Sequence, residues 1–176
     1  MEKPYSEIIG LPVLIEGLGR ASRITDILID SKNGSIAAFF VAGGRMKIIA
    51  PMDILFFGQA VVIGDMEDII DAEELIKAKQ IIEKDIWILG SRVKTKKGED
   101  LGNVHDYYVD TTYFGLTKIV VYKSYFGLFK TPERIIPSAD IIDIKKDLII
   151  VKNDWAKEKI TAKEETVKRL HPDMAA

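Results

Sequence analysis

The sequence predicts a mainly β protein: two small antiparallel β-barrels in tandem, a helical linker between them and a helix near the C-terminus. Three observations lead to this fold class. Residues 101–110 repeat the pattern of residues 21–30, with both aspartates kept 80 positions apart. Short apolar and β-branched runs alternate with turn residues such as glycine, proline and asparagine. Residues 71–84 break this rhythm and take up helical spacing.

The repeat is defined by one constant offset over about twenty positions. The pairs that keep the offset of 80 are Gly10 and Gly90, Val13 and Val93, Ile24 and Val104, Asp26 and Asp106, and Asp30 and Asp110. Such spacing indicates two copies of one unit in a chain of 176 residues. We therefore expect a first barrel at residues 1–65, a linker at 66–87, a second barrel at 88–153 and a C-terminal helix and tail at 154–176.

The first copy reads as short strands separated by turns. Strands are expected at residues 11–15, 23–30, 35–41, 45–50, 54–57 and 60–63. Asn33 and Gly34 supply a hairpin turn between the second and third of these strands. Residues 1–7 are expected to be a loosely held lead-in.

The second copy follows the same order. Strands are expected at residues 91–94, 103–110, 117–122, 134–136, 141–144 and 148–151. From Arg134 onward, residues of the second copy match residues of the first with an offset of 87 instead of 80. The second copy has therefore gained seven residues between Asp110 and Arg134. Most of the gain lies in residues 123–131.

Two segments have helical signals. Asp71 with Glu74 resembles a capping box at the start of residues 71–84, which predicts a linker helix of about three turns. Thr161 with Glu164 forms a similar pattern, and Pro172 would end that second helix near the C-terminus.

Composition excludes several classes of site. The chain has no cysteine, which rules out disulfides, zinc–thiolate sites and cysteine nucleophiles. No apolar run approaches the roughly 20 residues that a transmembrane helix needs, so we expect no transmembrane segment. The lack of cysteine and of a visible signal peptide fits a cytoplasmic location, which we expect. The net charge is −2, and neither half carries a dominant basic patch, so nucleic acid is not the expected partner.

The paired aspartates have two interpretations. Asp26 with Asp30, and Asp106 with Asp110, share a face of an extended strand and could approach a hard cation. Four residues of strand span about 13 Å, however, which is too far for one ion without other ligands. We favour a structural role in which each carboxylate accepts backbone N–H groups at a turn or strand end, and expect no metal site.

A catalytic set is not expected either. The chain has two histidines, His105 and His171, and an adjacent His105–Asp106 pair on a strand points to opposite faces. No nucleophile–base pair with a third orienting group can be assembled from these residues. The sequence thus predicts no enzyme activity and no cofactor.

The inserted loop of the second copy is unusually aromatic. Tyr125, Phe126 and Phe129 surround Gly127 in a connection that would ordinarily be polar. These side chains either fold back onto a barrel or form an exposed patch that anchors a partner. We name these three aromatic residues as the candidate partner-binding site.

At its repeated motifs the chain resembles the PRC-barrel family, in a version with two barrels in tandem. The likeness rests on residues 89–93, Gly98, residues 101–106, 109–110, 135–137 and 140–141, and covers about residues 8–63 and 88–152. The structural motif residues on this view are Gly10, Asp26, Asp30, Gly90, Gly102, Asp106, Asp110 and Pro137. The first copy departs from the pattern at Ser22, where glycine is usual, and at Ala50-Pro51, where the proline is shifted by one.

This resemblance implies small β-barrels that act as adaptor or assembly modules, without shared catalytic residues. Relatives include the cytoplasmic cap of the photosynthetic reaction centre and a ribosome-maturation factor, so a ribosomal or membrane-complex partner is one expectation. The alternatives are an RNA- or ribosome-associated factor and a small-ligand or metal-binding barrel. Formation of a homo-oligomer is left open.

Overall fold

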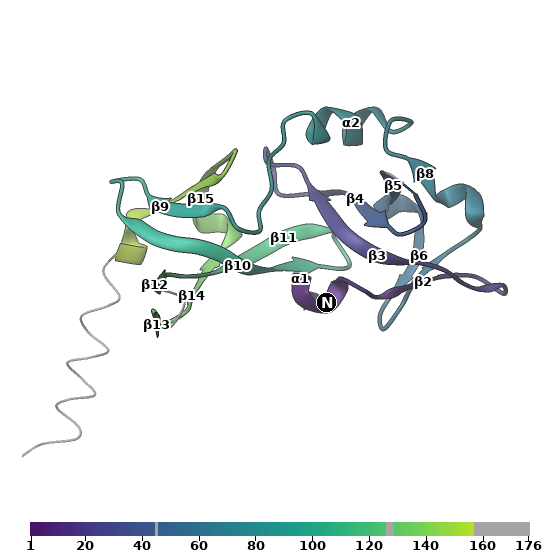
Figure 1. The fold of residues 1–176 in the computed structure, drawn as a ribbon, viewed down its shortest axis with the longest axis horizontal. Helices are drawn as coiled ribbons and strands as arrows, with labels where there is room; N and C mark the ends of the chain where they lie inside the picture. Colours follow the sequence, from purple (N-terminus) through teal and green to yellow (C-terminus); the bar gives the residue numbers. More distant parts are fainter. Residues whose placement is uncertain (45, 126–128, 157–176) are drawn as a thin grey trace, which may run out of the picture.

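In the computed structural model the chain is mainly β, with two strongly curled sheets that lie side by side (Figure 1). The structure describes residues 1–44, 46–125 and 129–156, and at residues 125, 129, 130 and 156 it describes the backbone alone. The expected C-terminal helix therefore falls almost entirely outside the described residues.

The first sheet has the strand order β6-β7-β2-β3-β4-β5-β8. Its strands are β2 (Pro12–Ile15), β3 (Gly19–Ile29), β4 (Ile36–Val41), β5 (Lys47–Ile49), β6 (Ile54–Phe57), β7 (Val61–Ile63) and β8 (Ile70–Asp71). The second sheet has the order β14-β11-β10-β9-β16-β15, with β1 added to β10. Its strands are β1 (Glu2–Pro4), β9 (Arg92–Thr95), β10 (Asp100–Asp110), β11 (Gly115–Tyr122), β14 (Arg134–Pro137), β15 (Ile141–Lys145) and β16 (Leu148–Val151).

The expectation of wholly antiparallel sheets is wrong at one place in each sheet. Strand β2 pairs with β7 in parallel, and β9 pairs with β16 in parallel. The cause is a short 3₁₀ corner, η1 (Pro51–Asp53) in the first sheet and η3 (Ser138–Asp140) in the second. Each corner carries the chain from one strand to the next without reversing its direction, so the last strand returns parallel to the first.

The strand register repeats with the offset seen in the sequence. Val13 lies opposite Ser22, and Val93 lies opposite Gly102. Asp26 lies opposite Phe40, and Asp106 lies opposite Val120. Register shifts also recur, between Ile24 and Asp26 in one sheet and between Val104 and Asp106 in the other. Residues 23–29 of β3 and their counterparts in β10 thus occupy equivalent strands with equivalent bulges.

The two sheets meet through their long hairpins. Ser35 forms an isolated antiparallel bridge with Gly115, its own counterpart 80 residues on. Ile36 N–H donates to Phe114 C=O at 2.7 Å, and Leu116 N–H donates to Gly34 C=O at 2.8 Å. These two bonds are equivalent under the offset, so a local pseudo-twofold axis passes between Ser35 and Gly115.

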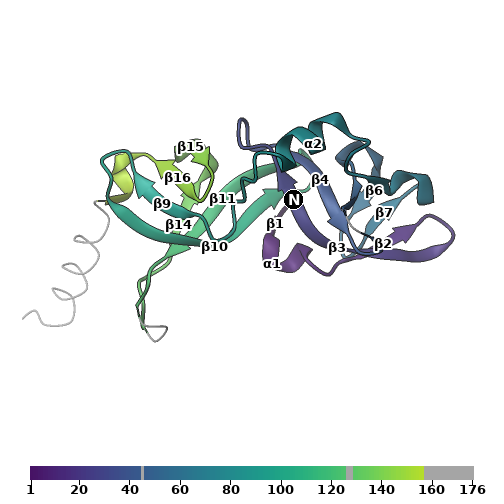
Figure 2. The ribbon, with the colours of Figure 1, turned by 45° about the horizontal axis from the view of Figure 1, so that its top comes forward.

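The N-terminal segment is ordered, and the expectation of a loose lead-in is wrong. Strand β1 pairs with β10 of the second sheet, and the single helical turn α1 (Tyr5–Ile8) follows it. Figure 2 shows β1 and α1 at the junction between the sheets. Ile8 has no exposed surface, because it packs into the core that both sheets share.

A single helix, α2 (Ile76–Ile82), lies in the segment expected to be the linker helix. It has seven residues, not three turns, because Asp71 belongs to β8 and the Glu74 carboxylate accepts its N–H before the helix begins. Ala78 and Ile81 of α2 pack on Leu28, Ala38 and Phe40 of the first sheet. Strand β4 is therefore covered on both faces, which explains its continuous apolar sequence.

Candidate functional site

The outer corner of the first sheet exposes a cluster of large apolar side chains. Strand β6 stands at the end of that sheet and, among the residues that the structure describes, pairs with β7 alone. A register shift between Ile54 and Phe56 turns two consecutive side chains outward, so Leu55 is 60% exposed and Phe56 is 61% exposed. Met52 of η1, just before the strand, is 87% exposed. We call Met52, Leu55 and Phe56 the β6 surface.

Backbone geometry helps to hold Phe56 in place. The position that a Cβ atom would take at Gly58 is only 2.6 Å from the Phe56 ring. The ring therefore lies against the backbone of Gly58, where a larger residue would displace it. This contact leaves the outer side of the ring exposed and limits its freedom.

The stretch of sequence that contains the β6 surface is acidic. Between Lys47 and Lys77 the chain carries seven acidic residues and no basic residue. Burial, followed by the nearby charge of Asp68, raises the pKa of the Asp53 carboxyl above its usual range. Asp68 itself accepts the N–H groups of Gly64 and Asp65 at 2.8 and 3.1 Å. Asp53 follows Met52 in η1, so at least one acidic group lies beside the apolar side chains.

The equivalent corner of the second sheet has the same backbone and different side chains. Strand β15 has a register shift between Ile141 and Asp143, and Ile142 is 50% exposed. Asp143 occupies the place of Phe56 and forms an ion pair with Lys145 at 3.2 Å. Charges on an edge strand oppose the pairing of that edge with another chain. Of the two corners, only the first presents an uninterrupted apolar strand.

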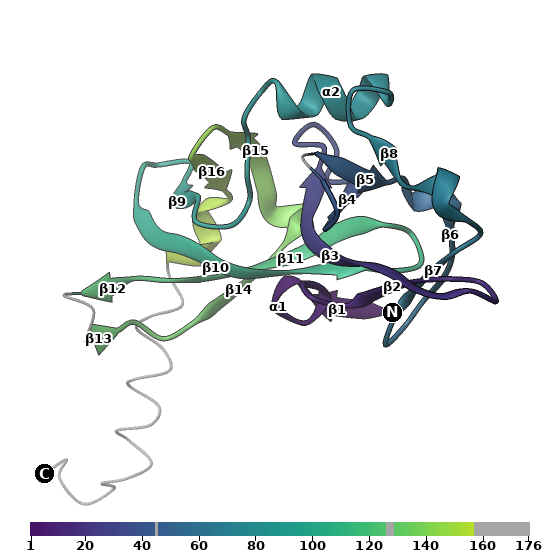
Figure 3. The ribbon, with the colours of Figure 1, turned by 45° about the vertical axis from the view of Figure 1, so that its right-hand side comes forward.

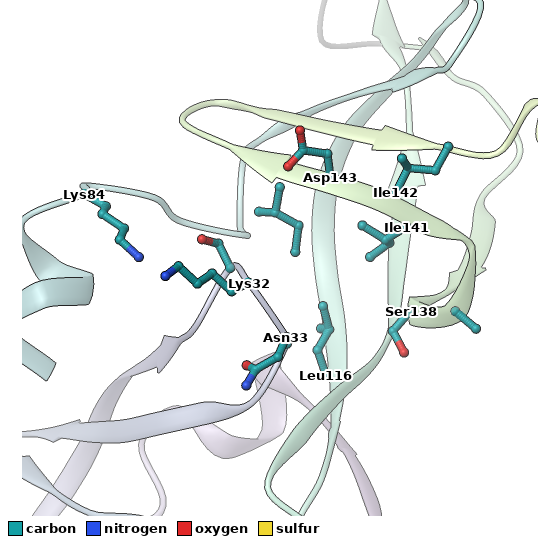
Figure 4. A pocket seen from close by; sticks show the side chains of 12 residues that line it. Lys32, Asn33, Lys84, Leu116, Ser138, Ile141, Ile142 and Asp143 are labelled. Atoms are coloured by element: carbon teal, nitrogen blue, oxygen red, sulfur yellow. The ribbon is translucent and has the colours of Figure 1, made fainter. Parts of the chain in front are cut away.

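A cleft of about 540 Å³ opens between the two sheets (Figure 4). One wall is the β3–β4 turn with Lys32, Asn33 and Gly34, and the other is η3 with β15. Leu116 and Ile141 contribute apolar surface. Figure 4 shows the side chains of Lys32 and Lys84 on the same side of the cleft. Neither ammonium group forms an ion pair within the part of the chain that the structure describes.

The equivalent place in the first sheet is filled by an aromatic ring. Phe114 is the counterpart of Gly34, and both residues have a left-handed backbone, with φ of 51° and 73°. The Phe114 ring lies 6.0 Å from the Phe39 ring and 6.3 Å from the Phe57 ring. Gly34 has no side chain to do the same, so the cleft beside it stays open.

The predicted aspartates accept hydrogen bonds at strand bulges and turns. Asp26 accepts Ile27 N–H at 2.8 Å and the Tyr5 hydroxyl at 3.2 Å. Its counterpart Asp106 accepts Tyr107 N–H at 2.8 Å and the Ser6 hydroxyl at 2.6 Å. The turn α1 therefore touches the equivalent carboxylates of both sheets.

The second pair of aspartates lies at the hairpin turns. Asp30 accepts Lys32 N–H at 3.1 Å, and Asp110 accepts Thr112 and Tyr113 N–H at 2.7 and 2.8 Å. Asp26 and Asp30 do not converge, nor do Asp106 and Asp110. Among the described residues, no group of three or more acidic or histidine side chains gathers where it could hold a metal ion.

Burial shifts the ionisation of the groups around α1. It raises the pKa of Tyr5 to about 12, with the Asp26 carboxylate adding to the effect. Burial also raises the pKa of Asp26, which two hydrogen bonds counteract in part. Tyr107, whose ring centroid is 4.9 Å from that of Tyr5, has its pKa raised well above the usual value by burial. These groups form a packed joint between the sheets.

The motif glycines and Pro137 occupy backbone positions. Gly10 N–H donates to Ile24 C=O and Gly90 N–H to Val104 C=O, both at 2.9 Å. Gly102 has φ of 113°, and a Cβ atom there would lie 2.3 Å from the Tyr122 carbonyl oxygen. At the matching place in the first sheet, the Ser22 hydroxyl donates to Ala42 C=O. Pro137 ends β14 and precedes η3.

The candidate aromatic loop forms a hairpin that runs away from the body of the molecule (Figure 3). Its strands are β12 (Ser124–Tyr125) and β13 (Phe129–Lys130), and Tyr125 lies opposite Phe129. Within the described part of the chain these two strands pair only with each other. Phe126 and the side chains of Tyr125 and Phe129 lie outside the described residues.

Reasoning from the sequence did not single out the β6 surface. The available signal was the comparison of equivalent strands, since the first copy has Leu55-Phe56 where the second has Ile142-Asp143. In the described part of the chain, no helix is both long and apolar enough to cross a membrane. Comparison with protein-family models gave no match, and comparison with curated proteins gave none either.

Proposed function

We propose that this chain is a non-enzymatic protein-interaction module, made of two tandem PRC-type β-barrels, that binds a partner protein through the β6 surface. The observation that supports this function is the exposed Leu55–Phe56 bulge on an edge strand. Aromatic and aliphatic side chains exposed together are typical of binding anchors. An edge strand also offers unpaired backbone groups to an extended segment of a partner.

The tandem-barrel part of the proposal is supported by the shared register of the two sheets and the local pseudo-twofold axis at Ser35 and Gly115. The likeness of the second copy to PRC-barrel motifs fits this arrangement. Fold alone does not give a function, so the proposal depends on the surface.

The partner that fits the β6 surface carries basic residues around an apolar segment. Seven acidic residues and no basic residue surround this surface in the sequence. Opposite charges steer association and suppress wrong partners, whereas like charges facing each other are costly. A second copy of this chain docked β6 to β6 would bring two such acidic segments together. We therefore assign the surface to a different, basic protein.

The test is affinity capture from the native host, followed by binding measurements with the purified captured protein. Phe56→Asp gives the first copy the side chain of the second and should weaken binding by about 1–4 kcal/mol. Ile135→Asp is the control, because Ile135 is similarly exposed, at 52%, on β14 of the second sheet. Binding should also weaken as salt is raised.

Equal loss of binding in both variants, or no loss with Phe56→Asp, would remove the β6 surface from the proposal. Capture that disappears after nuclease treatment would favour the RNA-associated alternative.

We propose the hairpin of Tyr125, Phe126 and Phe129, which the sequence predicts as the principal recognition surface, as a second contact beside the β6 surface. If a partner covers it, Phe126→Ala and Phe129→Ala should each weaken binding by about 1–4 kcal/mol and leave the melting temperature nearly unchanged. A loss of stability without a loss of binding would instead assign these rings to packing.

A further inference from the structure

We propose that the cleft between the sheets binds an aromatic side chain of a partner protein, where that side chain is flanked by acidic residues. This inference rests on the proposed interaction function but concerns a separate surface from β6. It is carried by the chain's own pseudo-symmetry, which places an aromatic ring in the equivalent site.

The open cleft and the filled site around Phe114 are equivalent under the repeat offset. Gly34 and Phe114 are 80 residues apart, share a left-handed backbone and take part in the two symmetric hydrogen bonds that join the hairpins. The surroundings correspond as well, since Leu116 is the counterpart of Ile36 and Ile144 is the counterpart of Phe57. One site is filled from within the chain, and its twin is open.

An aromatic ring fills the closed site. The Phe114 ring reaches the rings of Phe39 and Phe57 at 6.0 and 6.3 Å. In the open site the corresponding positions are Ile119 and Ile144, and Ile144 lines the cleft with Leu116 and Ile141. Apolar walls of this kind remain for a ring supplied from outside.

Two lysine side chains lie at the rim of the cleft. Lys32 and Lys84 line the cleft without an ion-pair partner among the described residues, whereas Asp143 is paired with Lys145 at 3.2 Å. The unpaired charge at the cleft is therefore positive. Acidic residues beside the inserted aromatic ring would complement it. The occupant is accordingly opposite in charge to the one assigned to the β6 surface.

The experiment titrates the ¹⁵N-labelled full chain with a seven-residue peptide, Gly-Ser-Asp-Phe-Asp-Ser-Gly, and follows amide shifts. We expect saturable shifts at Gly34, Leu116 and Ile142, and at least fivefold weaker binding when the peptide has alanine for phenylalanine or lysine for both aspartates. Equal binding of these control peptides, shifts confined to other residues or no saturation at millimolar peptide would overturn the proposal. Equally tight binding of phenylacetate would also overturn it, by assigning the cleft to a small aromatic acid.

Two variants locate the binding in the cleft. Gly34→Phe supplies the missing ring at a backbone conformation that Phe114 already adopts, so the chain should stay folded. Because the new ring fills the cleft, the affinity for the peptide should fall at least tenfold. Lys32→Glu with Lys84→Glu should weaken binding at least tenfold without filling the cleft. Arg20→Glu is the charge control, because Arg20 lies near the start of β3, whereas the cleft lies beyond the other end of that strand.

The two proposals fail separately. Loss of peptide binding in Gly34→Phe, with partner capture through Phe56 intact, supports the cleft and leaves the β6 surface unaffected. Unchanged peptide binding in both the Gly34→Phe variant and the double lysine variant would overturn the cleft proposal, whatever the Phe56→Asp variant does.

Discussion

The corners η1–β6 and η3–β15 share one backbone and differ in their chemistry. Both pass from a 3₁₀ turn into an edge strand with a register shift that exposes two consecutive residues. The first corner exposes Leu55 and Phe56, and the second exposes Ile142 and Asp143. Since the backbone is shared, folding does not require the exposed phenylalanine. This difference is the basis on which we propose a binding role for the first corner.

A second difference between the copies lies at the joint of the hairpins. The left-handed backbone of Phe114 costs about 1–2 kcal/mol, and the packing of its ring against Phe39 and Phe57 offsets this strain. Gly34 adopts the same conformation without that strain and leaves the cleft open. The copies have thus kept their hydrogen bonds and diverged in the side chains around them.

The largest expected effect comes from exchanging the residues at one bulge. Gly102→Ser would place a Cβ atom 2.3 Å from the Tyr122 carbonyl oxygen at a φ of 113°, and should destabilise the fold by about 3–5 kcal/mol. Ser22→Gly, the reverse exchange in the first copy, loses one hydrogen bond and should cost about 1 kcal/mol. Urea unfolding measures both free energies. Similar losses of unfolding free energy in the two variants would contradict the difference between the bulges, namely that the second accepts only glycine.

A smaller effect is expected at the filled site. Phe114→Gly removes a half-buried ring but also relieves the backbone strain, so the net destabilisation should be about 1–3 kcal/mol. Thermal or urea unfolding gives this value. A stabilised variant would show that the ring contributes less than its strained backbone costs, and would weaken the argument from pseudo-symmetry.

The smallest expected effect concerns Asp26, whose pKa burial raises. A carboxyl with a raised folded-state pKa contributes stability below its unfolded pKa of about 3.9 and loses it as pH rises through the folded value. Asp26→Asn should therefore gain stability relative to the natural chain as pH rises from about 4 to 7, because the amide cannot ionise. Urea unfolding across this range measures the difference.

Asp100 serves as a control, because its pKa is shifted in the opposite direction to that of Asp26. A hydrogen bond from Arg92 at 3.0 Å lowers the pKa of the Asp100 carboxyl, so its contribution is present above the unfolded pKa and is lost as pH falls. Asp100→Asn should lose stability relative to the natural chain as pH rises. If the stability of both variants, relative to the natural chain, changed with pH in the same direction, the causes assigned to the two pKa shifts would be contradicted.

Local patterns in the sequence predicted much of the fold. The constant offset located equivalent strands, and the Asn33–Gly34 turn lies where the hairpin was expected. The N-terminal residues were misjudged because β1 is held by a strand more than 100 residues away, and no local signal reports such pairing. The parallel pairs were missed for a related reason, since chain direction through η1 and η3 depends on corner geometry.

The candidate sites were less predictable because exposure depends on bulges. Leu55 and Phe56 belong to a fully apolar run, Ile54–Phe57, which reads as buried strand until the register shift is known. The cleft beside Gly34 likewise depends on how two distant hairpins meet. The hairpin with Tyr125 and Phe129 was identified from its composition, and its role in binding stays a prediction.

The most direct test of the central claim is hydrogen–deuterium exchange of the full chain with and without the captured partner. The two edge strands serve as each other's control, because β6 and β15 have the same backbone and equivalent pairing. We expect the β6 amides to exchange more slowly in the complex and the β15 amides to exchange at an unchanged rate. Protection of β15 or of β12–β13 without any at β6 would contradict the assignment of partner binding to the first corner.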